Sequence, residues 1–493
     1  MDARGGEAPL SRHPLPRRRH LGADLPRPHS LLGRPRRPPA PPGRGPLLSD
    51  GRLDVVVVGG GISGLTAAFH LSRGGLRTAV LEAAARVGGA IETYSDGTWR
   101  FEMGPNTVLE NNESVGRLIR EAGLDGEKIV AAPAARKRYL YKGGTLVPLP
   151  GGPGGFLATP LFPLGSKLGL LREPWIRRPP EGTEESIAQF VRRRLSTAFL
   201  DYAVGPFVSG VYAGDPERLS VRWAVPKIWS LEHEHGSLIR GALARRKGPA
   251  PGGAMISFRG GLEELPRRLA REIGDVRTGV AAQRIVRADG GFRIETSAGP
   301  VEAARVVLAV PADAAARLLE EAAAGASRLF AEIPYAAVAV VSLGWRREDV
   351  GHPLDGFGFL APRKEGLRVL GCLFPSEIFP GRAPAGHVAL AAFGGGRTDP
   401  EFASWDDDRI LSTVLSELRG PLSLRGEPAF RLVRRWPRAI PQYEVGHGRF
   451  VERAKEIEEA LPGLRIAGNF VGGVSVPDCI KSGTAVVEGM LRG

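Results

Sequence analysis

Cysteine is scarce in this sequence: its 493 residues include only two, Cys372 and Cys479. Two thiols are too few for a disulfide scaffold or a four-thiolate metal site, and they favour a reduced cytosolic compartment. Long apolar runs are also missing, because no uninterrupted stretch reaches the roughly 18–20 residues that a membrane-spanning helix needs. A transmembrane anchor is therefore not expected, whereas attachment to a membrane surface stays open.

Acidic residues are in the minority, with 53 Asp and Glu against 67 Lys and Arg, which gives a net charge of +14. Such an excess suggests nucleic acid or an anionic membrane as a partner. The basic residues are not interleaved with aromatics on a recognisable nucleic-acid module, so no nucleic-acid partner is expected. Because 42% of the residues are hydrophobic, the chain can bury a large core, and disorder is excluded as its main state.

Residues 1–50 differ in composition from the rest. They hold ten arginines, no lysine, four acidic residues and 11 of the 42 prolines, which accounts for +6 of the net charge. Repeated proline interrupts helices and removes the donors of strand ladders. We expect a disordered Pro/Arg-rich extension rather than the amphipathic helix of a transit peptide.

Regular structure is expected to begin at Leu53. Residues 53–58 form a β-branched run typical of a strand buried on both faces, and a helix is predicted over 65–73. A second strand over 77–82 completes a β-α-β unit. Helical spacing also recurs over 184–199 and 262–273, with strands expected at 305–310 and 336–343, and residues 110–245 are expected to be mostly helical.

The turn after the first strand contains G-x-G-x-x-G as Gly59, Gly61 and Gly64. Gly59 allows the tight turn, Gly61 lets the backbone approach a pyrophosphate, and Gly64 lets the helix pack closely on the strand. Glu82, at the end of the second strand, is placed to accept hydrogen bonds from both hydroxyls of a ribose. The unit is therefore predicted to bind a dinucleotide.

Two further segments favour FAD over NAD. Residues 82–90 carry an R-x-G-G pattern after the ribose acid, with Arg86 and Gly89 in it. Residues 464–476 have the pattern of a strand, a glycine turn and a helix, which would place a second helix N-terminus near the flavin.

The whole pattern resembles the oxygen-dependent protoporphyrinogen oxidase family of flavoenzymes, which includes bacterial enzymes that oxidise coproporphyrinogen III. The resemblance runs from about Leu53 to Leu491. Its most specific segments are 101–106, 136–141, 210–220, 230–241, 258–266 and 473–483. The segment 210–220 separates this family from other amine-oxidase-class flavoenzymes.

The resemblance implies an α/β fold with α+β elements. It has a Rossmann-like FAD-binding domain of the monoamine oxidase type, an inserted substrate domain and a helical membrane-binding domain. The expected boundaries are 1–50 for the extension, 51–110 with 255–306 and 437–493 for the FAD domain, 111–225 for the helical domain, and 226–254 with 307–436 for the substrate domain.

The resemblance also assigns residues to FAD and to the substrate. The expected FAD-binding residues are Gly59, Gly60, Gly61, Ile62, Ser63, Gly64, Glu82, Arg86, Gly89, Ala90, Gly104, Pro105, Asn106, Thr107, Val276, Asn469, Val474, Ser475 and Val476. The expected substrate residues are Arg138 for a propionate, Leu360 and Leu373 for clamping one pyrrole ring, Phe393 for stacking on another, and Gly210 for close backbone approach. From the sequence alone, Leu373 and Phe393 would fit a strand core equally well, and Arg138 a solvated basic cluster.

The activity implied by the resemblance is oxidation of protoporphyrinogen IX to protoporphyrin IX in haem biosynthesis. Hydride leaves a meso carbon for FAD, dioxygen becomes hydrogen peroxide, and three such cycles complete the porphyrin. Coproporphyrinogen III oxidase is the nearest alternative, followed by another amine-oxidase-class FAD oxidoreductase. No catalytic acid or base is assigned, because flavin carries the chemistry. No metal site is expected either, since His233 and His235 lack a third ligand.

The expected partners are the porphyrinogen, dioxygen and an anionic membrane surface; a homodimer is left open. Apolar patches at Phe156, Leu157 and 161–164, flanked by Arg172, Arg177 and Arg178, are predicted to lie at the interface. The protein is thus expected to be cytoplasmic and peripheral on the inner face of the cell membrane.

Overall fold

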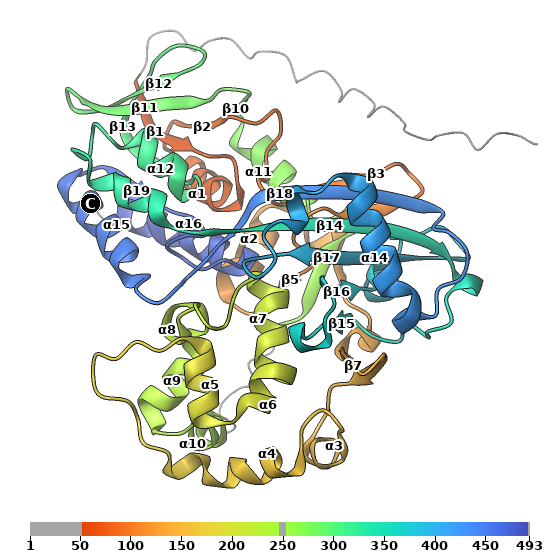
Figure 1. Cartoon of the computed structure of the whole chain (residues 1–493). Coiled ribbons are helices and arrows are strands. Elements are labelled where there is room, and N and C mark those ends of the chain that lie inside the picture. The colour runs from red at the N-terminus through yellow and green to blue at the C-terminus, as the bar shows by residue number, and fades with distance from the viewer. Residues whose placement is uncertain (1–51, 246–252, 492–493) are drawn as a thin grey trace, which may run out of the picture. The chain divides into compact units, whose positions relative to one another are not determined.

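The computed structural model describes residues 52–245 and 253–491, which form one compact unit. The predicted extension 1–50 lies outside the described residues. Figure 1 shows two sheets, with a group of helices, coloured yellow, beside them. Within the described ranges, no helix combines the length and hydropathy needed to cross a bilayer.

The first sheet has a parallel centre flanked by helices on both faces, so the predicted α/β fold class is confirmed. Its strands, in order across the sheet, are β10 (Val276–Thr278), β2 (Thr78–Glu82), β1 (Leu53–Val58), β13 (Val301–Leu308), β12 (Gly291–Thr296) and β11 (Ala282–Ala288), with β19 (Leu464–Ile466) parallel to β13. The antiparallel strands β11 and β12 form one end.

Strand β1 explains the layering, because its successive side chains point to opposite faces. Val55 and Val57 pack with helices α1 (Ile62–Arg73) and α16 (Val476–Leu491). Val56 and Val58 pack on the other face with α12 (Ala312–Leu318) and α15 (Gly448–Ala460). The predicted strand 53–58 is confirmed, while the helix begins at Ile62, three residues earlier than predicted.

The second sheet carries three of the predicted substrate residues, Leu360, Leu373 and Phe393. Its strands, in order, are β18 (Phe430–Pro441), β14 (Tyr335–Arg346), β17 (His387–Gly395), β16 (Val369–Leu373), β15 (Gly358–Leu360), β7 (Tyr139–Lys142) and β8 (Thr145–Pro148). Helix α14 (Asp407–Leu422) packs its apolar side on one face of this sheet. Trp99, Phe101 and Met103 pack on part of the other face, at Ala389.

Smaller elements connect the two sheets. They are the hairpin β3 (Thr93–Ser95) and β4 (Arg100–Glu102), the sheet β5 (Val108–Leu109), β9 (Met255–Phe258) and β6 (Lys128–Val130), and helices α2 (Glu113–Glu121), α11 (Glu264–Ile273) and α13 (Pro375–Ile378). Helix α11 confirms the spacing seen over 262–273.

The helical unit contains α3 (Pro153–Ala158), α4 (Leu164–Gly169), η3 (Leu170–Trp175), α5 (Ile187–Arg194), α6 (Thr197–Phe199), η4 (Leu200–Val204), α7 (Gly205–Tyr212), α8 (Val221–Ala224), α9 (Pro226–His235) and α10 (Leu238–Arg245). The single helix expected over 184–199 is wrong: α5 starts at Ile187, where Ser186 caps it, and ends before Leu195. Residues 110–245 are mostly helical, as expected, but they also contain three strands: β6 pairs with β9, and β7 pairs with β8 and β15. The domain boundaries stay a prediction.

One expectation about a surface patch is corrected by burial. Leu161 is fully buried and Phe162 is 6% exposed, packed with Phe199 of the helical core, so neither lies on an outer apolar patch. His233 and His235 lie on helix α9, where a spacing of two points them apart. His233 stacks on Trp229, with ring centres 4.3 Å apart.

Candidate functional site

The turn between β1 and α1 has two glycines that fill tight packing positions and one that faces open space. A Cβ atom on Gly59, whose φ is +109°, would lie 2.3 Å from the carbonyl oxygen of Ala309. On Gly64 it would lie 2.0 Å from the carbonyl oxygen of Gly59, whereas a Cβ on Gly61, the N-cap of α1, would meet nothing within 4 Å. This open helix N-terminus fits the pyrophosphate of a dinucleotide.

Glu82 is held at the end of β2 by two backbone donors. The N–H of Gly60 donates to Oε2 and the N–H of Ala84 donates to Oε1, both at 2.7 Å. A carboxylate has about four acceptor sites, so both oxygens can still receive ribose hydroxyls. Val276 lies on β10, directly beside Val80 of β2, at the same edge of the sheet.

Arg86 shapes the loop that follows. Its guanidinium donates to the carbonyls of Val87 (3.0 Å), Ile91 (2.9 Å) and Gly89 (2.7 Å), and pairs with Glu92 at 2.9 Å. Its charge is thus matched inside the protein. Arg86 therefore stabilises the conformation of the predicted FAD-binding loop.

The same loop meets the glycine turn on one side and Gly104 on the other. The N–H of Gly88 donates to the carbonyl of Gly60 at 2.8 Å. A Cβ on Gly104 would lie 2.1 Å from the carbonyl oxygen of Ala90, so only glycine fits there. Residues 104–107 are half-buried beside this contact, with the Asn106 amide donating to the carbonyl of Gly104 at 3.1 Å.

A second glycine turn lies between β19 and α16, confirming the predicted strand, turn and helix. The backbone N–H of Asp478 donates to Ser475 Oγ at 3.2 Å in the first turn of α16. Helix α16 packs so closely on α1 that a Cβ on Gly483 would lie 2.4 Å from the carbonyl oxygen of Ser63. The structure therefore brings the two predicted FAD-binding turns together across one helix pair.

The three apolar residues predicted to contact substrate share one face of the second sheet. Leu360 and Phe393 both lie opposite Gly371 in their strand pairs, and Leu373 follows Gly371 by two residues. Residues paired in this way, or two apart on one strand, point to the same face. A Cβ on Gly371 would lie 2.4 Å from the carbonyl oxygen of Phe359 and 3.3 Å from Leu360 Cδ2, so the neighbouring strand and the Leu360 side chain pass close to this glycine.

The opposite face of these strands is core. Phe359, Cys372 and Ala392 pack under α14 and are at most 2% exposed, whereas Leu360, Leu373 and Phe393 are half-buried. Burial raises the pKa of the Cys372 thiol well above its ordinary value, so this cysteine is an inert core residue. The predicted clamp residues are thus on the face away from the α14 core.

Gly210 and Arg138 border this face. A Cβ on Gly210 of α7 would lie 2.5 Å from Leu360 Cδ2, so the helix approaches the sheet there. Arg138 is exposed and lies two residues before Leu140, which pairs with Leu360; its guanidinium is 5.3 Å from the ring centre of Phe357.

Arg138 differs from its neighbour Lys137 in its charge partners. Lys137 pairs with Asp355 at 2.6 Å, whereas the Arg138 guanidinium lies 3.8 Å from Met255 Sδ and forms no ion pair with an Asp or Glu of residues 52–245 and 253–491. Its guanidinium is therefore available to a carboxylate from outside the chain, which it would bind as a planar fork.

Four residues that the sequence analysis missed hold the second sheet and the second glycine turn against the FAD segments. Arg434 pairs with Glu92 at 2.8 Å, and the Trp436 indole N–H donates to the carbonyl of Met103 at 2.6 Å. Tyr443 and His447 contact the second turn. The available signal is the alternation of residues 431–436 along a strand, which places Arg434 and Trp436 on one face.

Burial keeps the side chains of Tyr443, Tyr212 and His447 neutral. It raises the pKa of Tyr443 well above its ordinary value and that of Tyr212 to about 12. It also lowers the pKa of His447 to about 4. At neutral pH these side chains act as hydrogen-bond donors and packing groups.

Comparison with known proteins relates this arrangement to flavoenzymes. Residues 62–491 match the family of flavin-containing amine oxidoreductases. The chain is 35% identical over 466 residues to the chloroplastic protoporphyrinogen oxidase of Oryza sativa subsp. japonica, covering 87% of this chain and 86% of that protein. It is 30% identical over 474 residues to the coproporphyrinogen III oxidase of Bacillus subtilis (strain 168), covering 90% and 99%.

A solved structure shows the same fold. A crystal structure from Exiguobacterium sp. 255-15 that is assigned to the protoporphyrinogen oxidases superposes with a TM-score of 0.77 at 26% identity. The superposition covers 90% of this chain and all of that one. The predicted resemblance is thus confirmed over nearly the whole described chain.

Proposed function

The chain belongs to the flavin-containing amine oxidoreductase family and is an FAD-dependent oxidoreductase, and we propose that it oxidises protoporphyrinogen IX to protoporphyrin IX in haem biosynthesis. The similarity to protoporphyrinogen oxidases over most of the chain supports a porphyrinogen substrate. The observation that carries the proposal is the apolar face of Leu360, Leu373 and Phe393, bordered by the uncompensated cation of Arg138. An apolar tetrapyrrole with carboxylates on its rim needs both features.

In this proposal the protein binds and orients while the cofactor carries the redox chemistry. Gly61 and the N-terminus of α1 hold the pyrophosphate, and Glu82 holds the ribose. Arg138 pairs with a propionate, Leu360 and Leu373 clamp one pyrrole ring, and Phe393 stacks on another. Bound FAD supplies the two-electron oxidant, and dioxygen accepts the electrons as hydrogen peroxide. Fixing the tetrapyrrole in one orientation accounts for the protein's share of the rate.

The test is a direct assay of purified protein. It should be yellow from bound FAD, and it should convert protoporphyrinogen IX into fluorescent porphyrin while consuming oxygen and releasing hydrogen peroxide. Protein that holds FAD but leaves the porphyrinogen unoxidised beyond the spontaneous rate would contradict the proposal.

Coproporphyrinogen III is the second candidate substrate. The Bacillus relative, which the chain covers over 99% of its length, favours it. Coproporphyrinogen carries four propionates where protoporphyrinogen carries two, so it calls for additional cations around the apolar face. The two substrates should be compared side by side, and a higher kcat/KM for coproporphyrinogen would move the proposal to this alternative.

We propose further that the helical unit lies on an anionic membrane at the inner face of the cell membrane. Helices α4 and η3 follow one another, and they expose Leu164 (68%), Leu168 (56%), Leu171 (68%) and Trp175 (77%). The spacing of Leu164 and Leu168 is that of one α-helical face, and η3, which follows directly, exposes Leu171 and Trp175. Such an apolar face beside basic residues is typical of helices that lie in a membrane interface.

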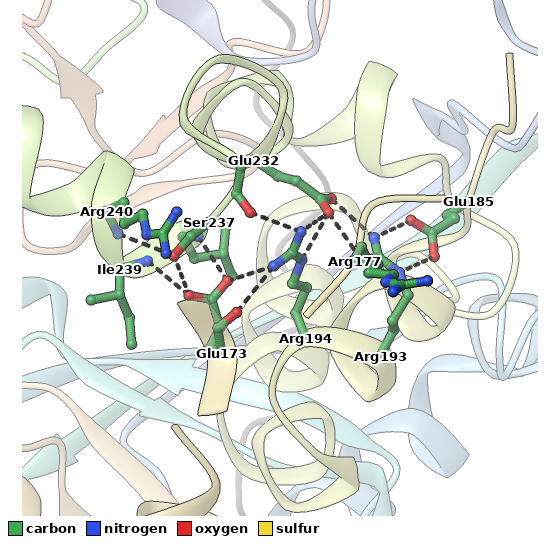
Figure 2. A network of polar contacts seen from close by, with 11 residues as sticks. Glu173, Arg177, Glu185, Arg193, Arg194, Glu232, Ser237, Ile239 and Arg240 are labelled. Carbon is green, nitrogen blue, oxygen red and sulfur yellow. Dashed lines mark hydrogen bonds and ion pairs between the residues drawn. The ribbon is translucent and has the colours of Figure 1, made fainter. Parts of the chain in front are cut away.

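A buried ion network fixes η3 with this face outward. Glu173, between Leu171 and Trp175, is fully buried; it pairs with Arg194 at 3.1 Å and accepts from the N–H of Leu238 at 2.8 Å. Figure 2 shows Glu173 and Glu232 on either side of Arg194. If Glu173 turned outward, the buried guanidinium of Arg194 would lose this carboxylate. Because removing one partner of a buried ion pair is costly, such a movement would cause a large loss of stability.

The network continues to the next arginine. Arg193 pairs with Glu185 and, at 2.9 Å, with Glu232, as the dashed lines of Figure 2 mark. Burial opposes ionisation of Glu232, but its hydrogen bonds to Arg193 and Arg194 prevail and lower its pKa. The network therefore joins η3, α5 and α9 and supports the membrane proposal by holding the apolar face in place.

A further inference from the structure

The segment 442–447, between β18 and α15, contacts three parts of the site at once. Neither the cofactor motifs nor the predicted substrate residues include it. Its side chains and backbone reach the turn between β19 and α16, the end of α7, and residues 218–220. Segment 210–220 is one of those that distinguished this chain's family in the sequence.

On the flavin side, Tyr443 holds the second glycine turn through its hydroxyl. The hydroxyl donates to the carbonyl of Asn469 and accepts from the N–H of Gly473, the latter at 2.9 Å. Tyr443 is 5% exposed, and the ring of His447 stacks on it with ring centres 4.1 Å apart. His447 Nε2 lies 2.9 Å from the carbonyl oxygen of Phe470. Three residues of one turn, Asn469, Phe470 and Gly473, are thus held by two neighbouring side chains.

On the side of the helical unit, the backbone of the same segment pairs with residues 218–220. The N–H of Ser220 donates to the carbonyl of Tyr443 at 2.8 Å, and the N–H of Val445 donates to the carbonyl of Arg218 at 3.0 Å. These bonds bracket an antiparallel bridge between Leu219 and Glu444. Tyr443 therefore cannot move without moving this part of the helical unit.

The segment also holds the end of α7, the helix that carries Gly210. Gln442 is 1% exposed, and its side-chain amide donates to the carbonyl of Tyr212, the last residue of α7, at 2.9 Å. A Cβ on Gly214 would lie 2.8 Å from Gln442 Oε1, so the chain passes Gln442 with no side chain between them.

We propose that segment 442–447 is a joint that sets the position of the flavin-side turn relative to the substrate wall formed by α7, with Tyr443 as the positioning residue for the turn and Gln442 for α7. The inference rests on the FAD and substrate sites proposed above. It gives segment 210–220 a physical role, because Tyr212, Gly214 and Ser220 of this segment contact the joint. Neither Gln442 nor Tyr443 is required to touch the reacting atoms.

The first test removes only the Tyr443 hydroxyl. In holoenzyme, Tyr443→Phe keeps the ring stacked on His447 but frees the carbonyl of Asn469 and the N–H of Gly473. FAD release, followed by the rise in flavin fluorescence on dilution, should be about tenfold faster, which corresponds to about 1.4 kcal/mol. The visible flavin band should also shift, because the turn beside the flavin is no longer held.

The matched control is Tyr202→Phe. Tyr202 also donates its hydroxyl to a protein acceptor, Glu365 at 2.8 Å, but it contacts neither turn. It should release FAD as the wild type does. If Tyr443→Phe lowers the melting temperature yet leaves FAD release and the visible band unchanged, Tyr443 is only a structural residue and the inference is wrong.

The second test separates the role of Gln442, which positions α7, from that of Tyr443, which positions the turn. Gln442→Met removes the donor to Tyr212 while keeping side-chain volume, so KM for the porphyrinogen should rise about fivefold with FAD release unchanged. An unchanged KM would overturn the role of Gln442. If the wild type binds FAD but oxidises no porphyrinogen, the proposed function fails, and FAD release from Tyr443→Phe still decides the role of Tyr443.

Discussion

A Cβ atom on Gly210 of α7 would lie 2.5 Å from Cδ2 of Leu360 on β15, so helix and sheet meet there without room for another side chain. Gly210→Ala should therefore displace the Leu360 side chain from the apolar face. Because Leu360 is one of the two residues proposed to clamp a pyrrole ring, this displacement should raise KM for protoporphyrinogen about tenfold, and FAD content should not change. Steady-state kinetics and the flavin absorbance of the purified variant measure the two quantities.

The double variant Gly210→Ala with Leu360→Val is the control for this prediction. The shorter valine side chain makes room for the new methyl group, so KM should fall part of the way back to the wild-type value. A single variant with the wild-type KM would show that this contact does not shape the substrate site.

The first glycine turn offers a comparison between two similar substitutions. A Cβ on Gly61 meets no atom within 4 Å, whereas one on Gly64 lies 2.0 Å from the carbonyl oxygen of Gly59. Gly61→Ala should keep its fold but lose FAD, because the methyl group enters the space assigned to the pyrophosphate. Gly64→Ala should instead unfold more easily, by about 1–3 kcal/mol, because backbone atoms must move.

Thermal unfolding without added FAD and the flavin content of the purified proteins distinguish these outcomes. Gly61→Ala with full flavin content would contradict the assignment of the pyrophosphate site.

The sequence predicts the parts of this site whose residues lie close together along the chain better than the parts whose residues are far apart. The turn at Gly59–Gly64 and Glu82 were found because they lie within one β-α-β unit, where spacing alone sets geometry. That Leu360, Leu373 and Phe393 point to one face depends on pairing between strands far apart in sequence, and only the structure supplies this register.

The residues missed and misplaced share one physical reason. Tyr443 and Gln442 act through side-chain hydrogen bonds to distant segments, and such bonds leave no periodic pattern in the sequence. Leu161 and Phe162 look like a surface patch because they stand among prolines and glycines, yet a pocket between helices buries them. Apolar composition predicts burial or membrane contact equally well until neighbouring elements are known.

Arg138 is predicted to bind a propionate of the substrate. Arg138→Ala should raise KM for protoporphyrinogen about tenfold or more, because a charge-assisted pair contributes roughly 1.5–3 kcal/mol, while flavin content stays unchanged. Arg138→Lys should recover only part of the affinity, since an ammonium lacks the planar fork. Arg136→Ala, at an exposed arginine two residues away, is the matched control and should keep the wild-type KM. Equal KM values for both alanine variants would remove Arg138 from the substrate site.

The exposed face of α4 and η3 is predicted to carry membrane affinity. Replacing Leu171 and Trp175 with serine should weaken sedimentation with vesicles containing anionic lipid at least tenfold, and activity toward soluble substrate should persist. Val130→Ser is the control, because Val130 is 59% exposed on β6, outside this face. Wild-type binding by the double serine variant would contradict the membrane proposal.

His447 makes stability depend on pH in a direction that its surroundings determine. His447 is 1% exposed, and its ring lies among the rings of Trp223, Tyr443 and Phe450. Burial lowers its pKa from an ordinary 6.5 to about 4. Between pH 6.5 and pH 4, His447 binds a proton in the unfolded chain but not in the folded protein. The contribution of neutral His447 to folding stability is therefore complete above pH 6.5 and is lost as pH falls toward 4.

The contribution of His447 should therefore fall by about 2 kcal/mol between pH 7 and pH 5, because one proton changes stability by about 1.4 kcal/mol per pH unit. His447→Gln keeps an N–H donor for the carbonyl of Phe470 but cannot titrate in this range. Free energies of unfolding from urea titrations at both pH values should fall more steeply for the wild type than for this variant. Since His447 supports Tyr443 and the second glycine turn, FAD release should also accelerate at pH 5 in the wild type and less in His447→Gln. Parallel pH profiles for the two proteins would show that His447 is charged at pH 5 without cost, contrary to its burial.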